Sequence, residues 1–286
     1  MPRTDGRVPR PPPSGWTNAP ARDGMRASGT LAGPIHPGYM AAGLRHRGSG
    51  LTPEDLAAKH PRLYHVADPG ALPGILRHGL LPTSALLSLF EVPDADREAV
   101  ERRRRPASVR LRHPVHGTAV ITDNLPLSEA ALEACLDDGL APADWLALLN
   151  SRVFFWPDEE GLGRLLGARL NRGRRRLVLV LDTLGLARRH RRRVELAAIN
   201  TGSTIRRPAR RGLSTFTPLL LHDYGAWRRL RGGLDRIREV TVVGGVADVA
   251  EHLVEHRVVG GGGVADGVGF EPTVGVNPRR FSRPVP

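Results

Sequence analysis

A run of five aliphatic residues at positions 177–181 constrains the fold more than any other part of the sequence. Three arginines, 174–176, precede the run, and Asp182 follows it. A short, continuous apolar run between charged residues is typical of a strand that is covered on both faces. We therefore expect residues 177–181 to form a central strand with other elements packed around it.

The rest of the middle of the chain predicts further strands and helices around this one. Thr52 and Pro53 mark a helix start, and Gly79 marks a helix end because glycine tolerates a positive φ. Further strands are predicted at 63–66, 108–112, 118–122, 152–156, 194–199, 213–221 and 239–243. Helices are predicted at 68–79, 83–90, 94–105, 158–172 and 246–256, and two more begin at Ser128 and Pro142. We expect residues 51–257 to form one α+β domain, with a split mixed β-sheet core and peripheral helices.

Both ends of the chain lack such periodicity. Residues 1–50 contain eight prolines and nine glycines, so they cannot bury enough apolar surface to offset the entropy of ordering. We expect disordered termini at 1–50 and 258–286, and a translation start at Met25 or Met40 is an alternative for the first segment. Codons for 270–272 and 280–284 can be chosen so that the opposite strand carries arms of a serine tRNA gene. The tail is therefore also interpreted as antisense read-through of a tRNA gene, which sequencing of the coding DNA would test.

The net charge of +13 is weaker support for a nucleic-acid partner than its size suggests. Of the 42 basic residues only Lys59 is a lysine, and an arginine excess of this kind is typical of GC-rich codon usage. Nucleic acid is one expected partner. For the arginine runs 102–105, 174–176 and 191–193, solvated helix ends are the favoured alternative to phosphate-binding sites.

The single cysteine, Cys135, excludes a disulfide framework and a cysteine-based zinc finger. We expect a buried, unreactive thiol, no disulfide-linked partner and a reducing, cytoplasmic location. No stretch approaches the roughly 18 apolar residues that span a bilayer, so no membrane association is expected. Residues 252–256 match the H-x-x-E-H order of inverted zinc metalloproteases. The downstream acids fall only in the expected tail, so no metal site is predicted.

The segments 63–66, Leu-Tyr-His-Val, and 72–80, Leu-Pro-Gly-Ile-Leu-Arg-His-Gly-Leu, resemble the first strand and helix of the ADP-ribosyltransferase superfamily. The resemblance is clearest to the branch that modifies nucleic acid and to the RNA 2′-phosphotransferases. The stretch 63–253 also resembles an uncharacterised bacterial family, through the strings at 152–156, 200–204 and 239–242. The resemblance implies an ADP-ribosyltransferase-like fold and NAD as a substrate.

The resemblance also implies a role for five residues. His65 corresponds to the histidine that bonds the adenosine ribose, Phe154, Phe155 and Trp156 to the aromatic surface for nicotinamide, and Glu239 to the catalytic carboxylate. Two departures stand out, because Phe or Trp replaces the usual tyrosine, and no E-x-E or Q-x-E pattern ends at Glu239, which follows Ile237 and Arg238.

Each of these residues also has a structural interpretation. His65 fits a strand in the hydrophobic core equally well, and the three aromatic residues fit a core better than a cofactor surface. Glu239 fits an ion pair with Arg236 or Arg238, and residues 200–204 fit a simple turn. The sequence therefore predicts an NAD-using ADP-ribosyltransferase-like protein, with nucleic acid as one candidate acceptor. The alternative is a non-catalytic nucleotide- or RNA-binding module on the same fold.

Overall fold

The computed structural model describes residues 50–205, 207–230 and 237–260. All of them fall within residues 44–286. The expectations for residues 1–49 and for the tail beyond residue 260, including tRNA read-through, therefore lie outside the described residues.

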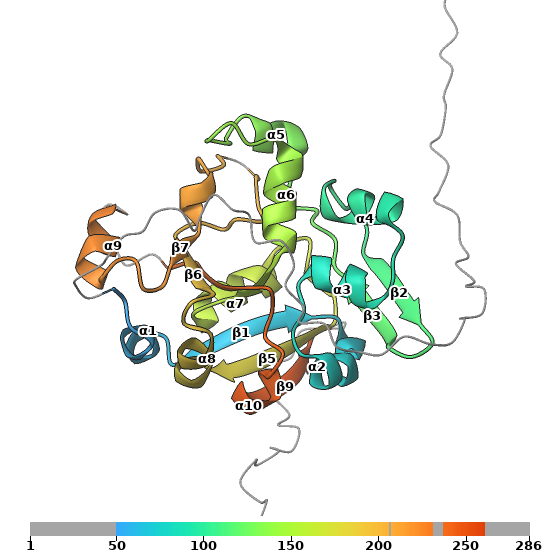
Figure 1. Cartoon of the computed structure of the whole chain (residues 1–286), viewed down its shortest axis with the longest axis horizontal. Helices are drawn as coiled ribbons and strands as arrows, with labels where there is room; N and C mark the ends of the chain where they lie inside the picture. Colours follow the sequence, from blue (N-terminus) through green and yellow to red (C-terminus); the bar gives the residue numbers. More distant parts are fainter. Residues whose placement is uncertain (1–49, 206, 231–236, 261–286) are drawn as a thin grey trace, which may run out of the picture. The chain divides into compact units, whose positions relative to one another are not determined.

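The first sheet places the aliphatic run at its centre. Its strands are β1 (Arg62–Ala67), β5 (Arg176–Asp182) and β9 (Leu253–Val259), in the order β1-β5-β9 (Figure 1). Both pairings are antiparallel. Residues 177–181 are all buried, because each alternate side chain meets a different core cluster. The predicted central strand is confirmed.

The second sheet carries most of the other predicted strands. It comprises β4 (Arg152–Phe155), β8 (Glu239–Val243), β6 (Val194–Ala197) and the two-residue β7 (Thr217–Pro218), in the order β4-β8-β6-β7. All neighbouring strands in this sheet are antiparallel. An isolated bridge joins the two sheets, with the backbone N–H of Tyr64 and of Trp156 each donating to the other's carbonyl at 2.9 Å. The α+β fold with a divided sheet is confirmed.

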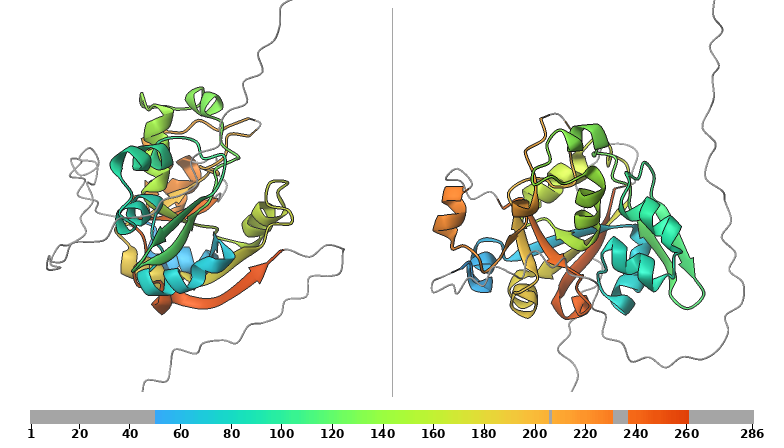
Figure 2. Two further views of the ribbon diagram at one scale, coloured as in Figure 1. Left: turned by 90° about the vertical axis from the view of Figure 1, so that its right-hand side faces the viewer. Right: turned by 45° about the horizontal axis from the view of Figure 1, so that its top comes forward.

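Helices and one hairpin surround the sheets (Figures 1 and 2). Thr52 caps α1 through reciprocal bonds with Asp55, as its position predicts. The hairpin pairs β2 (Val109–His113) with β3 (Gly117–Ile121), and short 3₁₀ turns occupy Pro69–Ala71 and Leu213–Thr215. The helices are α1 (Pro53–Lys59), α2 (Leu72–His78), α3 (Thr83–Leu89), α4 (Asp94–Glu101), α5 (Glu129–Glu133), α6 (Pro142–Asn150), α7 (Glu159–Gly167), α8 (Thr183–His190), α9 (Tyr224–Leu230) and α10 (Val249–His252).

A second core cluster lies beside α6. The Trp145 ring stacks on Phe216 with centroids 5.5 Å apart, and Cys135 is buried in the same cluster, as expected. None of the helices in the described ranges has both the length and the apolar character needed to cross a membrane.

Gly79 ends α2 with φ 81°, which confirms the helix end that the sequence predicts. A Cβ at this position would lie 2.5 Å from Ala247 Cα, so only glycine lets the backbones approach this closely. The next residue, Leu80, forms a two-bond bridge with Val246. The spacing of Leu72, Ile75 and Leu76 predicts one apolar face of α2, but Leu76 is 48% exposed, so this detail is wrong.

Two element predictions are wrong. The helix expected at 246–256 ends at His252, and the chain continues as β9 because its backbone pairs with β5. The strand expected at 213–221 is a 3₁₀ turn followed by two strand residues. In both places a non-local pairing, rather than local periodicity, determines the conformation.

Candidate functional site

A cleft of about 1300 Å³ opens between the two sheets, the β2–β3 hairpin and α7. All five residues singled out from the sequence line its wall: His65, Phe154, Phe155, Trp156 and Glu239. They come from β1, from β4 with the position after it, and from β8. The structure therefore brings together side chains that lie up to 174 positions apart in the chain, from residue 65 to residue 239.

His65 presents one ring nitrogen that has no hydrogen-bond partner among the described residues. Its Nδ1 lies 2.9 Å from the Phe154 carbonyl oxygen, and because a carbonyl can only accept, Nδ1 carries the proton. Burial lowers the pKa of His65, although the bond to Phe154 opposes this effect. The neutral ring therefore keeps a lone pair on Nε2, which can accept a hydrogen bond from a ligand hydroxyl.

The three aromatic residues do not share one environment. Phe155 is 1% exposed and belongs to the main core, which is the structural interpretation considered for it. Phe154 and Trp156 are half-buried and lie on two other clusters, Phe154 edge-on to Phe216 and Trp156 near Leu162. Phe154 and Trp156 are therefore the aromatic surfaces that a ligand in the cleft could reach.

Glu239 opens β8 and is 4% exposed. Its carboxylate accepts hydrogen bonds from Thr201, at 2.6 Å from Oγ1 and 3.2 Å from the backbone N–H. Burial raises the pKa of Glu239 to about 7, while the Thr201 bonds and the charge of Arg211 act in the opposite direction. Arg236 lies outside the described residues, and Arg238 is exposed, so the partner found is Thr201 rather than an arginine.

Two residues that sequence reasoning missed hold Thr201 in place. Its carbonyl oxygen accepts from Arg211, at 2.9 Å from a terminal guanidinium nitrogen, and from Trp145 Nε1 at 3.3 Å. Arg211 is 2% exposed, and a buried guanidinium needs such acceptors. Nothing in the local sequence marks Arg211 among the many arginines. These contacts make Arg211 and Trp145 positioning residues for the Thr201–Glu239 pair.

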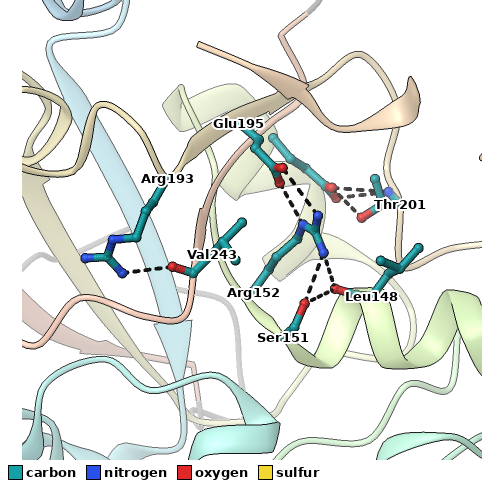
Figure 3. A network of polar contacts seen from close by, with 8 residues as sticks. Leu148, Ser151, Arg152, Arg193, Glu195, Thr201 and Val243 are labelled. Atoms are coloured by element: carbon teal, nitrogen blue, oxygen red, sulfur yellow. Dashed lines mark hydrogen bonds and ion pairs between the residues drawn. The ribbon is translucent and has the colours of Figure 1, made fainter. Parts of the chain in front are cut away.

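A buried ion pair anchors β4 (Figure 3). Arg152 Nε lies 2.7 Å from Glu195 Oε2, and its terminal nitrogens reach Glu195 Oε1, the Leu148 carbonyl and the Ser151 hydroxyl. The guanidinium also lies 4.3 Å from the centre of the Phe216 ring. Arg152 lines the cleft, so this network fixes the strand that carries the aromatic surfaces.

A cluster of two imidazoles and a carboxylate joins α8 to α10, and none of its members lines the cleft. One ligand-type atom from each of His190, Asp248 and His252 lies within 4.8 Å of the others, which would suit a metal ion. A terminal nitrogen of Arg193, however, is 2.6 Å from His190 Nδ1. Because a guanidinium only donates, His190 Nε2 carries the proton and donates it to Asp248 Oδ1 at 2.7 Å.

The proton arrangement favours a hydrogen-bonded clamp over a metal site. A metal on His190 Nε2 would displace its proton and leave an Nδ1–H facing the Arg193 donor. Arg189 also donates to Asp248, at 3.2 Å, so both carboxylate oxygens of Asp248 already accept hydrogen bonds. The H-x-x-E-H motif does not form one helical face, because α10 ends at His252 and His256 lies on β9.

We expect Asp248→Asn to lower the free energy of unfolding by about 1.5–3 kcal/mol, the usual contribution of a hydrogen bond to a charged group. The amide keeps one acceptor but presents a donor to Arg189 or His190. Urea unfolding of the full chain would measure the change, with exposed Glu98→Gln as a control. If zinc raised the urea midpoint of the wild type but not of Asp248→Asn, the cluster would be a metal site instead.

The described residues thus form an α+β protein whose cleft, between two antiparallel sheets, combines a neutral histidine, two aromatic surfaces and a buried carboxylate. Residues 61–253 match the model of a family of unknown function, DUF7002. The match covers more than half of the chain, and the chain belongs to this family. No curated protein matches it. No solved structure matches it either.

Proposed function

We propose that the protein transfers ADP-ribose from NAD to an acceptor in this cleft, with nucleic acid as the acceptor class. The observation that supports the proposal best is the joint position of His65, Trp156 and Glu239 on one cleft wall. In the reaction the bond between ribose C1′ and the nicotinamide nitrogen breaks, and its electron pair leaves with neutral nicotinamide. An acceptor oxygen or nitrogen forms the new bond to C1′ and releases a proton.

Glu239 supplies the negative charge that such a reaction needs. The transition state resembles an oxocarbenium ion, as in glycoside hydrolysis, and a nearby carboxylate stabilises it. The ionised form can also accept a hydrogen bond from a ribose hydroxyl. The Thr201 bonds hold the carboxylate in one orientation before substrate arrives, so little reorganisation is required at the moment of reaction.

His65 and the aromatic pair would bind rather than react. The lone pair on His65 Nε2 suits a hydroxyl of the adenosine ribose, and the half-buried faces of Phe154 or Trp156 suit the flat nicotinamide ring. Neither aromatic side chain reproduces the hydroxyl of the tyrosine usual in the superfamily, and Ile237 stands where the first residue of an E-x-E or Q-x-E pattern would be. The acceptor must therefore be selected by residues other than a second carboxylate.

We expect His65→Ala to weaken NAD binding about tenfold, close to 1.4 kcal/mol, because one hydrogen bond is lost. Isothermal titration of the full chain with NAD would measure it. His222→Ala is the matched control, since His222 does not line the cleft. Equal NAD affinity in wild type and His65→Ala would remove His65 from the nucleotide site.

The second candidate is a non-catalytic nucleotide- or RNA-binding module that uses the same cleft. The raised pKa of Glu239 and the missing second acid favour it. Nicotinamide release separates the two candidates. Binding of NAD or RNA with no release in the presence of single-stranded RNA, single-stranded DNA or protein acceptors would support the module and contradict the transferase.

A further inference from the structure

The structure separates the three arginine runs that look equivalent in the sequence. Three of the four arginines in the first run are used internally, because Arg102 pairs with Asp144 at 2.7 Å, and Arg104 and Arg105 donate to backbone carbonyls. Arg103 is exposed. The last run is divided, because Arg193 donates to two carbonyls while Arg191 and Arg192 are exposed at the end of α8. Neither Arg191 nor Arg192 lines the cleft.

The remaining run belongs to a longer basic segment, residues 169–176, which leads from α7 into β5 (Figure 2). The sequence holds no acidic residue between Glu160 and Asp182. Arg174 pairs with Asp123 and Arg176 with Asn171. Arg169, Arg172 and Arg175 are exposed, and within the described ranges their side chains form no hydrogen bond or ion pair. Unpaired like charges this close repel each other, so a bound polyanion would stabilise the segment.

The basic segment reaches the cleft itself. Arg169, Leu170 and Asn171 are part of its wall. The cleft volume of about 1300 Å³ exceeds the range of about 300–1000 Å³ that is usual for small-molecule sites. The same wall includes His78 and His116, each of which has a buried ring nitrogen without a partner in the described structure. The cleft therefore has room and unused polar atoms for a second ligand beside a dinucleotide.

We propose that the basic segment binds the sugar-phosphate backbone of single-stranded nucleic acid and guides one nucleotide into the cleft as the ADP-ribose acceptor. Guanidinium groups bind phosphate in a bidentate manner, and flat aromatic and imidazole rings suit unstacked bases. A base in a duplex cannot enter such a cleft without leaving its stack, which favours a single strand. That the bound nucleotide accepts ADP-ribose rests on the proposed function, whereas binding of the single strand by the basic segment does not.

The test measures binding of fluorescently labelled single strands of about 12 nucleotides, DNA and RNA, to the full chain by anisotropy at several salt concentrations. Arg172→Gln/Arg175→Gln is the variant, because both residues are exposed and lie outside the cleft wall. Arg191→Gln/Arg192→Gln is the matched control, with the same loss of charge in another exposed run. Titration with NAD in the absence of oligonucleotide accompanies each variant.

The segment variant is expected to bind the single strands at least about tenfold more weakly than the control. Its slope of log affinity against log salt should be shallower by about 1.4, since each single-strand phosphate contact contributes about 0.7. NAD affinity should be the same in both. Equal losses in variant and control, tighter binding to duplex of equal length, or full competition by polyglutamate would each overturn the proposal. Oligonucleotide binding without any nicotinamide release would instead contradict only the proposed transferase function.

Discussion

Replacing Glu239 by glutamine is expected to slow nicotinamide release by about 100- to 1000-fold, or about 2.7–4 kcal/mol of transition-state stabilisation. Glutamine keeps the shape of the side chain, so most contacts with Thr201 survive. It removes the negative charge, which matters most when positive charge develops on the ribose. NAD affinity should therefore change much less than turnover, and initial rates at saturating NAD would show the difference.

The control for this variant is Glu251→Gln, because Glu251 is exposed on α10 and does not line the cleft. Rates are compared at equal concentrations of folded protein, which a urea titration of each variant establishes. Equal release by wild type and Glu239→Gln, both above a blank without enzyme, would show that Glu239 is a structural residue at the start of β8.

The same carboxyl group makes stability depend on pH. Its pKa is about 7 in the folded protein, above its ordinary value of 4.5, so between these values the folded state holds a proton that the unfolded state has lost. The contribution is fully present below pH 4.5 and is lost as pH rises through about 7. Turnover should rise over the same interval, because the ionised form is the reactive one. Glu239→Gln should flatten this part of the stability profile.

The features that the sequence predicts well depend on short stretches of chain. Residues 177–181 form β5 because five adjacent aliphatic side chains need cover on both faces. Thr52 begins α1 and Gly79 ends α2 because their caps involve neighbours within a few positions. By contrast, β9 follows directly on α10, and only its pairing with β5 distinguishes it from a longer helix. The sequence analysis predicts no helix at the position of α8. Asp182 is a recognisable N-cap, because its side chain accepts a hydrogen bond from the backbone N–H of Gly185. The arginine-rich end of α8, however, weakens the amphipathic pattern of the helix.

The sequence likewise reveals some residues of the candidate site and not others. His65 and Glu239 stand out because each lies on a recognisable strand and fits the resemblance to the transferases. Thr201 and Arg211 do not stand out in the sequence. Thr201 matters because it donates hydrogen bonds to Glu239, 38 positions away, and Arg211 matters because it holds Thr201 in place. A buried arginine that serves a threonine carbonyl cannot be distinguished from a surface arginine until the topology is known.

Glu195→Ala is expected to lower the free energy of unfolding by about 3–5 kcal/mol, the cost of leaving one partner of a buried ion pair alone. The side chains of Arg152 and Glu195 are only 10% and 13% exposed. Without the carboxylate, Arg152 keeps its Leu148 and Ser151 partners, but two of its three guanidinium nitrogens lose theirs. Because β4 carries Phe154, the same variant should also loosen the wall of the cleft.

The matched control is the exposed pair of Glu54 and Arg188, whose side chains are 53% and 61% exposed. Glu54→Ala should lower stability far less than Glu195→Ala does, because water replaces the lost partner. A double variant, Arg152→Met/Glu195→Leu, distinguishes the two sources of the large effect. If the loss of stability comes mainly from the unpaired charge of Arg152, the double variant should recover most of the stability that Glu195→Ala loses. If it remains as unstable as the single variant, the attraction between the two charges itself stabilises the fold, and β4 depends on it directly.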